Sequence, residues 1–447
     1  MRSKLVGGLL AVVLLAGCAI RSNQPAPLTV GAIYPLSGSQ GSGGREELGG
    51  VQAALHLLSS ELGNRHIQLQ IEDVQTPAGT KAAVDNLIDN YHVPLILGTY
   101  GSTLAEAAAA RADQRHVLYW ESGAVADLVT QHRDYVFRTV ATGMTLGNTA
   151  VHFTHDVLLP ADHLQPAQAR AVIVSVDDTY GRSVGDGEEA LAHQLGIPVV
   201  DRIRYSTNAV DPTAIAQRIS ADHPDYLWDV SYLDDGIAIW RAVRQRGIPL
   251  RAAVGTSSAF CMEDFGKKLG KEAIGVFAAD KPDDQVSPKA LAPAAQQLLK
   301  RAESAYASQR ISDRMSLSAV AGFVAGWTLF HDVLPRVKGE ITPDHLRTAA
   351  YQIDQPMGTS INGGGVKFAP AGAENAGQNL RAPSMVGQWQ KVQDIHTVYP
   401  PGFATASIIS LPPPAPEKEN LFPQNSSPQN LSPSSPPLSS PSSWGVY

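Results

Sequence analysis

Short apolar runs alternate along the chain with longer stretches in which apolar residues recur every three or four positions. Residues 28–34 form the first apolar run, and Leu48, Val51, Leu55 and Leu58 then recur with the spacing of one helix face. The alternation continues, and it predicts strands at 28–34, 67–71, 93–97 and 117–120 with helices at 48–62, 84–88 and 103–112.

A second block of the same kind begins after residues 137–159. Its apolar runs predict strands at 171–176, 199–203, 226–230 and 252–255, with helices at 184–195, 212–221 and 237–245 between them. Repeated strand–helix–strand units build parallel sheets that are covered by helices on both faces. The pattern therefore predicts an α/β protein with two doubly wound, parallel-sheet lobes.

The loops that follow the predicted strands carry the residue types of a binding pocket. Ligands of such sheets bind beyond the carboxyl ends of the strands. Gly, Ser, Thr, Tyr and acidic residues are frequent there, and they offer close backbone approach, neutral hydrogen bonds and aromatic faces. The loops are 34–44, 98–103, 120–126, 177–183, 231–235 and 255–260. Their composition predicts a pocket for a small polar molecule.

The first eighteen residues have the features of a bacterial lipoprotein leader. A short positive region precedes an apolar run from Leu5 to Leu15, and Leu15-Ala16-Gly17-Cys18 matches a lipobox. The run is too short to span a bilayer, and we expect no other span of about 20 apolar residues after it. We therefore expect residues 1–17 to be a cleaved signal peptide, with acyl chains on Cys18 that anchor an extracytoplasmic protein to a membrane.

Three further features narrow the possibilities. With Cys18 lipidated, Cys261 has no partner for an internal disulfide, and we expect it to be a small buried apolar residue. Residues 411–447 are rich in Pro and Ser, which predicts a disordered or extended tail. The net charge of -7 argues against nucleic acid as a partner.

Signatures of catalysis are scarce. The sequence has no Walker loop, no His-Glu-x-x-His and no Cys-x-x-Cys, and we predict no metal or cofactor. Gly181-Arg182-Ser183-Val184-Gly185 matches Gly-x-Ser-x-Gly, but a nucleophile elbow places its serine directly at a strand end, and residues 177–180 intervene here. We favour a helix-capping region, and a serine esterase that uses Ser183 stays as a minor alternative.

Five motifs at the predicted loops are specific in combination. They are Val30–Gly38, Leu97-Gly98-Thr99-Tyr100-Gly101-Ser102, Asp177-Asp178-Thr179-Tyr180-Gly181, Ser231–Gly236 with the helix to Ile248, and Gly363–Phe368. In order and spacing over residues 28–401, they resemble the type I periplasmic solute-binding proteins of ABC importers, in particular the Leu/Ile/Val receptor group. The resemblance implies a receptor that closes on a small molecule and delivers it to permease subunits.

The resemblance also implies a hinge that the chain crosses three times. The first lobe would consist of residues 28–140 and 274–348, and the second of residues 141–273 and 349–401. A ligand that contacts both lobes only when they are closed would shift the population toward the closed form. A permease would then recognise that form, and no bond would be made or broken.

The binding residues that the resemblance implies come from both lobes. The segment Tyr100, Gly101 and Ser102 would hold a carboxylate or similar polar head, beside a wall of Glu121, Ser122 and Gly123. Tyr180 and Tyr232 would close over the ligand from the second lobe, and Thr256, Ser257 and Ser258 would line its far side.

The chain departs from the family at residues 120–125. Amino acid receptors of this group usually carry small hydroxyl-bearing residues there, whereas this chain has Glu121 and Val125. A Glu121 carboxylate in the pocket would attract an ammonium or amide, and Val125 stands in the place of a hydroxyl that would hold an amino acid head group. The expected ligand is an amino acid, an amide or a related compound.

Two other functions fit the same fold. An envelope scaffold or regulatory lipoprotein would bind a protein partner and would have a degraded pocket. A sensor subunit would use the pocket for regulation instead of transport.

Overall fold

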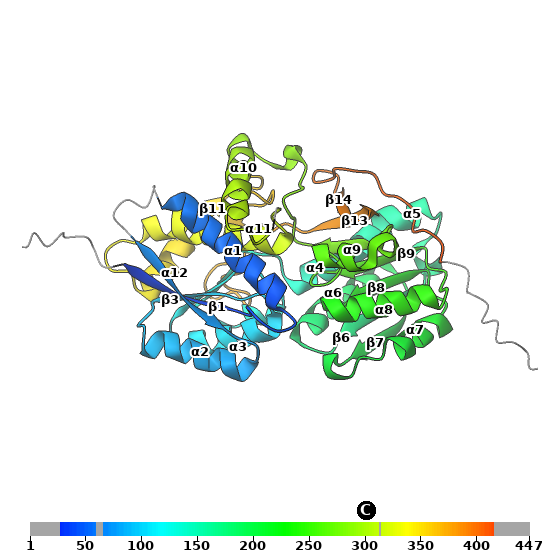
Figure 1. The fold of residues 1–447 in the computed structure, drawn as a ribbon, viewed down its shortest axis with the longest axis horizontal. Coiled ribbons are helices and arrows are strands. Elements are labelled where there is room, and N and C mark those ends of the chain that lie inside the picture. Colours follow the sequence, from blue (N-terminus) through cyan, green and yellow to red (C-terminus); the bar gives the residue numbers. More distant parts are fainter. Residues whose placement is uncertain (1–26, 60–65, 313, 415–447) are drawn as a thin grey trace, which may run out of the picture.

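The computed structural model describes residues 27–59, 66–312 and 314–414. These residues form two α/β lobes that lie side by side (Figure 1). The predicted signal peptide and Cys18 lie outside the described residues, as does residue 415 onward of the predicted tail. Residues 411–414 lie on the second lobe, where Arg244 donates hydrogen bonds of 2.9 and 2.8 Å to the carbonyl oxygens of Pro412 and Pro413.

The first lobe is built on a five-stranded parallel sheet of order β2-β1-β3-β4-β5. The strands are β1 (Leu28–Tyr34), β2 (Ile67–Asp73), β3 (Leu95–Gly98), β4 (Leu118–Glu121) and β5 (Val136–Arg138). Side chains alternate between the two faces of a strand. Val30, Ala32 and Tyr34 of β1 accordingly belong to one core and Ile33 to the other.

Helices cover both faces of this sheet. One face packs against α1 (Gly41–Leu58), the continuous helical run of α11 (Leu317–Trp327) and η7 (Thr328–Val333), and α12 (Pro343–Ala350). The other face packs against α2 (Pro77–Asp89) and α3 (Ser102–Gln114), and α10 (Pro293–Ala307) packs outside α1 and α11. The short hairpin β11 (Asp354–Gln355) and β12 (Val366–Lys367) completes the lobe.

One helical run is long and apolar enough to cross a membrane, although no such segment was expected from the sequence. Leu317–Arg336 has a mean hydropathy of 1.4, but 89% of it is buried inside the protein. It is apolar because it lies between α1 and α10 in the core of the first lobe.

The second lobe has a seven-stranded sheet of order β14-β13-β10-β9-β8-β6-β7. Five strands are parallel: β6 (Ala171–Val176), β7 (Val199–Tyr205), β8 (Tyr226–Val230), β9 (Ala252–Thr256) and β10 (Phe277–Asp280). At one side of the sheet, β13 (Met385–Lys391) pairs antiparallel with β10 and with the edge strand β14 (Asp394–Tyr399). One face packs against α4 (Gly143–Phe153), α5 (Leu159–Ala161) and α6 (Thr179–Leu195), and the other against α7 (Pro212–Ala221), α8 (Leu233–Gln245) and α9 (Glu263–Leu269).

The predicted fold class of two parallel-sheet lobes is confirmed, but the structure places two of the three crossings later than expected. The second crossing was expected before residue 274, whereas β10 pairs with β9 and therefore belongs to the second lobe. The third was expected at 349, whereas Ile353, Val366 and Phe368 share a core with Trp120 of the first lobe. The antiparallel pair β13 and β14 was not anticipated.

Arg138 is the polar centre of the hinge. It is fully buried at the end of β5, and it donates hydrogen bonds of 2.6 Å to the side chain of Gln378 and to the carbonyl of Ala126. Burial lowers the pKa of its guanidinium to about 10. Asn379 donates to the carbonyl of Thr139 at 2.9 Å, and Gln378 to that of Val140 at 2.8 Å. The crossing after β5 and the crossing before β13 therefore lie side by side.

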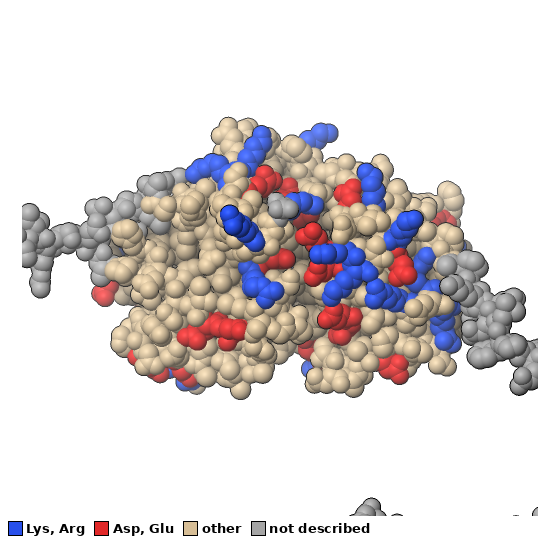
Figure 2. Space-filling view, in the orientation of Figure 1, with Lys and Arg blue, Asp and Glu red and all other residues tan. Residues whose placement is uncertain are grey.

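The face seen in Figure 2 carries charges of both signs. Lys and Arg are denser over the second lobe, but Asp and Glu lie among them. On α8 and α9, for example, Lys268 is 2.9 Å from Asp234. This face therefore presents paired charges instead of one continuous basic field.

Candidate functional site

The loop between β3 and α3 forms the first wall of a cavity between the lobes. Tyr100, Gly101 and Ser102 line it, and Ser102 begins α3. The Ser102 hydroxyl accepts hydrogen bonds from the N–H groups of Val125 and Ala126 at 3.3 and 3.2 Å. Ser102 thus fixes the loop after β4 against the loop after β3, and its own O–H stays available as a donor.

The structure places the Glu121 carboxylate outside the cavity, contrary to the expectation. Glu121 is fully buried in the first lobe, where it accepts hydrogen bonds from the N–H groups of Thr99, Gly123 and Ala124 at 2.7 to 3.0 Å. The Tyr119 hydroxyl donates a fourth bond of 2.7 Å. A carboxylate is an acceptor only, and here it satisfies the donors of the loop instead of facing a ligand.

Ser122 also points away from the cavity, toward a second buried carboxylate. Its hydroxyl is 2.6 Å from Glu47 and 2.9 Å from the Tyr34 hydroxyl. Burial, and then the neighbouring Glu121, raise the pKa of Glu47, and burial likewise raises that of Glu121. Of the expected wall, only Gly123 lines the cavity. The position requires glycine, because a Cβ there would lie 1.7 Å from Glu47 Oε2.

Two tyrosines of the second lobe form the opposite wall. Tyr180 and Tyr232 line the cavity, and their ring centroids are 5.4 Å apart. The Tyr180 hydroxyl donates to the carbonyl oxygen of Thr256, and the Tyr232 hydroxyl donates to Asp178 Oδ2 at 2.7 Å. Burial raises the pKa of both tyrosines, so both stay protonated donors at neutral pH.

The loop after β9 contributes two serines but not the expected threonine. Ser257 and Ser258 line the cavity, whereas the fully buried Thr256 donates its hydroxyl hydrogen to Glu188 at 3.2 Å inside the second lobe. The two serines have φ values of 49° and 21°. This left-handed backbone turns them back toward the first lobe.

Lys281 is a residue of the cavity that the sequence analysis missed. It directly follows β10, lines the cavity and is 5% exposed. The apolar run Val276–Ala279 could have revealed it, because such a run indicates a strand and binding residues were expected in the loops that follow strands. No strand was predicted at this segment, so the loop after it was not considered.

The cavity is nearly closed in this conformation. Its volume is about 10 Å³, which is room for about one water molecule. Thr179 donates to Glu106 of the first lobe at 2.9 Å, and the Tyr100 hydroxyl is 3.7 Å from Met262 Sδ of the second. The lobes therefore touch around the cavity.

A wider groove lies between the lobes outside the cavity. Its volume is about 630 Å³, and its residues include Ser37, Gln75, Asp178, Asp234 and Asp235. Tyr232 lines both spaces, so its ring is the partition between the inner cavity and the groove.

Ser183 does not have the geometry of a nucleophile elbow. It lies inside α6, which Asp178 caps by accepting a hydrogen bond from the Gly181 N–H. The Ser183 hydroxyl donates to Asp127 of the first lobe and accepts from its N–H at 3.0 Å. Its partner is thus a carboxylate across the lobe interface, where an esterase needs a histidine base.

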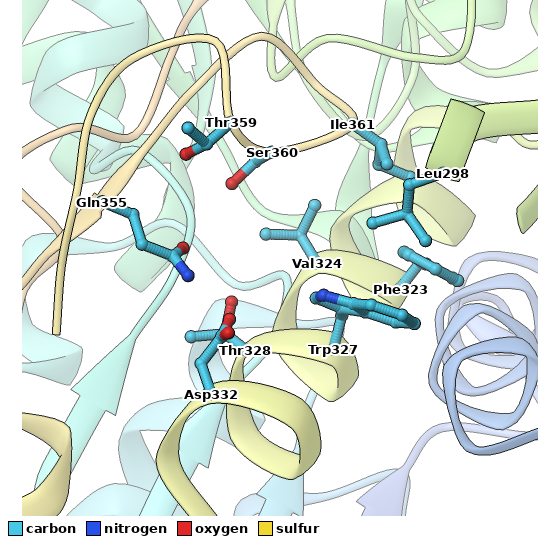
Figure 3. Close-up of a pocket in the computed structure, with 10 residues that line it drawn as sticks. All are labelled: Leu298, Phe323, Val324, Trp327, Thr328, Asp332, Gln355, Thr359, Ser360 and Ile361. Atoms are coloured by element: carbon cyan, nitrogen blue, oxygen red, sulfur yellow. The ribbon is translucent and has the colours of Figure 1, made fainter. Parts of the chain in front are cut away.

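Another cavity lies within the first lobe, away from the hinge. Its volume is about 40 Å³, room for about three water molecules. Figure 3 shows Gln355 of β11 and Thr359 and Ser360 of the loop after it, facing Asp332 and Thr328 on the α11–η7 run. Because one lobe alone lines it, a molecule there would not be enclosed by lobe closure.

Comparisons with known proteins agree with this geometry. The family described as periplasmic binding protein matches residues 27–391. Leu/Ile/Val-binding protein homolog 8 of Brucella abortus (strain 2308) is 28% identical over 408 residues, covering 90% of this chain and 98% of the relative.

Two solved structures share the fold over most of the chain. The branched-chain amino acid transporter substrate-binding protein of Streptococcus pneumoniae, in complex with isoleucine, has a TM-score of 0.68 at 18% identity and covers 84% of this chain and 100% of its own. A solute-binding protein of an ABC transporter from R. palustris, in complex with benzoate, has a TM-score of 0.69 at 18% identity. The match covers 85% of this chain and 98% of that protein.

Proposed function

Because the chain belongs to the periplasmic binding protein family, the non-enzymatic solute receptors of ABC transporters, we propose that it binds a small polar molecule between its lobes and delivers it to an ABC permease. The observation that carries this proposal is the composition of the inner cavity. Tyr100–Ser102 and Gly123 come from one lobe, and Tyr180, Tyr232 and Ser257 come from the other.

Such a cavity couples binding to closure. A ligand between the walls contacts both lobes only in the closed form, so its binding energy favours that form. The hydroxyl groups and the backbone around Ser102 supply neutral hydrogen bonds, and the tyrosine rings supply apolar faces with polar tips. The relatives bound to isoleucine and benzoate support a ligand of similar size.

A thermal-shift screen of residues 19–447, which include every described residue, tests the receptor proposal. Saturating ligand should stabilise the protein by about 3 to 4 kcal/mol at a hundred- to a thousandfold excess over the dissociation constant. Ser102→Ala and Tyr180→Ala should abolish the shift while the proteins stay folded. A broad library of amino acids, amides, polyamines, nucleosides and organic acids without any hit would refute a receptor role.

We also propose that Cys18 carries the membrane anchor. The support is the lipobox Leu15–Cys18 behind a positive and apolar leader. Mass spectrometry of the purified protein should find a diacylglyceryl group on Cys18, and Cys18→Ala should move the protein to the soluble fraction. An unmodified Cys18 in the mature protein would contradict the anchor.

One observation favours a second candidate, an envelope scaffold that binds a protein partner. The inner cavity of about 10 Å³ is too small for an organic molecule unless the lobes separate. A scaffold would stay in this closed form, whereas a receptor opens. Small-angle scattering should therefore show a larger radius of gyration for the ligand-free receptor than for the complex, and an unchanged radius favours the scaffold.

A further inference from the structure

Lys281 is the one charged residue that lines the inner cavity as the structure describes it. Its side chain is 6% exposed, and Nζ lies 3.2 Å from Asp280 Oδ1 and 3.4 Å from the carbonyl oxygen of Gly123. Gly123 belongs to the first lobe and Lys281 to the second. An ammonium has three donors, so one remains for a group in the cavity after these two contacts.

Among the described residues that line the same cavity there is no carboxylate. Its lining has six hydroxyl-bearing residues, and Asp280, the partner of Lys281, lies behind it without any exposure. The carboxylate of Glu121 points into the first lobe, and Glu47 accepts a bond from Ser122 there. The second oxygen of Glu47 lies behind Gly123, but burial raises the pKa of this carboxyl, which favours its uncharged form. A ligand ammonium in the cavity would therefore meet only hydroxyl and carbonyl acceptors, and it would lie beside the like charge of Lys281.

The wall opposite Lys281 also favours an anion. It contains the N-terminus of α3, a helix of 13 residues that begins at Ser102 and has no side-chain cap. The first N–H groups of a helix lack intrahelical acceptors, and the helix dipole attracts negative charge to them. The first lobe thus offers N–H donors and the second lobe an ammonium to the same space.

The outer groove has the opposite charge. Asp178, Asp234 and Asp235 line it, and no Lys or Arg is among its described residues. The ammonium of Lys281, paired with Asp280, therefore lies on the inner side of Tyr232, and the three carboxylates lie on its outer side. A molecule that extends from the cavity into the groove is oriented by this difference, with its anionic end inward.

We propose that the ligand is a small organic carboxylate without an ammonium group next to the carboxylate, and that the carboxylate binds between Lys281 and the N-terminus of α3. This inference rests on the proposed receptor function and names its ligand class. The carboxylate links the two lobes, and the rings of Tyr100, Tyr180 and Tyr232 flank the rest of the molecule. An α-amino acid, in contrast, carries its ammonium into the part of the cavity that Lys281 occupies.

A matched six-carbon series tests the ligand class by calorimetric titration of residues 19–447. The series is hexanoate, 2-aminohexanoate, 6-aminohexanoate and hexylamine, and benzoate with benzylamine forms an aromatic pair. We expect an acid to bind in at least one series, its amine not to bind, and 2-aminohexanoate to bind at least tenfold more weakly than hexanoate. The 6-amino acid should bind no more weakly than hexanoate, because its ammonium reaches the acidic groove.

The outcomes separate this inference from the receptor proposal. Tighter binding of 2-aminohexanoate or an amine than of the matching acid overturns the carboxylate assignment. So does a stabilising hit in the broad library that is an α-amino acid or has no carboxylate, although the receptor proposal then stands. If nothing in the library binds, both proposals are wrong.

A variant of Lys281 tests the residue itself. Lys281→Gln should weaken binding of the acid by about tenfold to a hundredfold, the range of one charge-assisted hydrogen bond. Lys271→Gln, at an exposed lysine of the same lobe, should leave the affinity unchanged. If Lys281→Gln is unfolded, the double variant Asp280→Asn with Lys281→Gln replaces it in the binding experiment, because it removes both charges of the pair and leaves no buried carboxylate unpaired. Unchanged affinity in a folded Lys281 variant refutes its role.

Discussion

The hydroxyl of Tyr232 donates a hydrogen bond of 2.7 Å to Asp178 Oδ2, and this bond fixes the ring that separates the inner cavity from the outer groove. Asp178 also caps α6, through a bond of 2.9 Å from the Gly181 N–H. The partition is therefore held by the same carboxylate that fixes the start of a helix. The ring can therefore move when its bond to Asp178 breaks, while the bond that caps α6 stays in place.

Tyr232→Phe should accelerate ligand dissociation. The ring remains but loses its bond to Asp178, so the partition opens at a cost lower by about 1 kcal/mol, or roughly fivefold in rate. Stopped-flow fluorescence with a ligand from the screen measures the rate. Tyr91→Phe, at an exposed tyrosine, should change nothing. A dissociation rate identical to that of the wild type would show that the ligand leaves by another route.

Glu121→Gln should destabilise the protein by about 3 kcal/mol. The carboxylate accepts three backbone N–H bonds and one from Tyr119, whereas a glutamine amide would direct an NH₂ group at some of these donors. Urea denaturation measures the loss, and Glu340→Gln at an exposed position is the control. Normal stability combined with loss of ligand affinity would instead place Glu121 in the pocket.

The free energy of unfolding should fall as the pH rises from about 4.5 to about 8. Burial raises the pKa of Glu188 to about 8 and that of Asp229 to about 7. In this range the native state keeps protons that the unfolded state has lost, so the unfolding free energy decreases with pH. The loss is on the order of 3 to 5 kcal/mol for Glu188 alone.

Glu188→Gln tests this pH dependence, because glutamine cannot ionise and can still accept the bond from Thr256. Its unfolding free energy, from urea denaturation at pH 5.5 and pH 8.5, should change less between the two values than that of the wild type. The exposed Glu189, beside it in the chain, provides the control Glu189→Gln. An unchanged slope in Glu188→Gln would mean that this carboxyl is ionised in the native protein.

Arg138→Lys should lower the unfolding free energy by about 2 to 4 kcal/mol. The guanidinium bonds Gln378 and the carbonyl of Ala126 at the same time, and an ammonium cannot reproduce that planar geometry. Differential scanning calorimetry should show a lower Tm, with Arg246→Lys as the exposed control. If the Tm stays the same, the stability of the hinge does not depend on the planar guanidinium of Arg138.

The alternation of apolar runs and helical spacing was enough to predict both lobes, because buried parallel strands must be apolar and lie between helices. It failed for β13 and β14, whose residues pair antiparallel at a sheet edge after the alternation has ended. It also missed β10, although β10 has four residues like β3 and β4, which were predicted. The misplaced hinge crossings came from the resemblance instead of the alternation.

Loops after strands were the right places to look for the cavity, since Tyr100–Ser102, Gly123, Tyr180, Tyr232 and Ser257 are brought together there. Sequence could not show where each side chain of a loop points. Glu121 and Ser122 are neighbours of Gly123, but they turn inward because unpaired N–H and carboxyl groups in the first lobe must be satisfied. Ligand contact by the residues in the cavity stays a prediction.

The described chain begins and finishes at opposite outer ends of the molecule. Residue 28 starts β1 in the first lobe, and residue 414 lies on the second (Figure 1). Only residues 19–27 separate the first strand from Cys18, a span of at most about 36 Å. The proposed anchor at Cys18 would therefore hold the first lobe at the membrane surface. Opening and closing would then be a movement of the second lobe relative to a fixed first lobe.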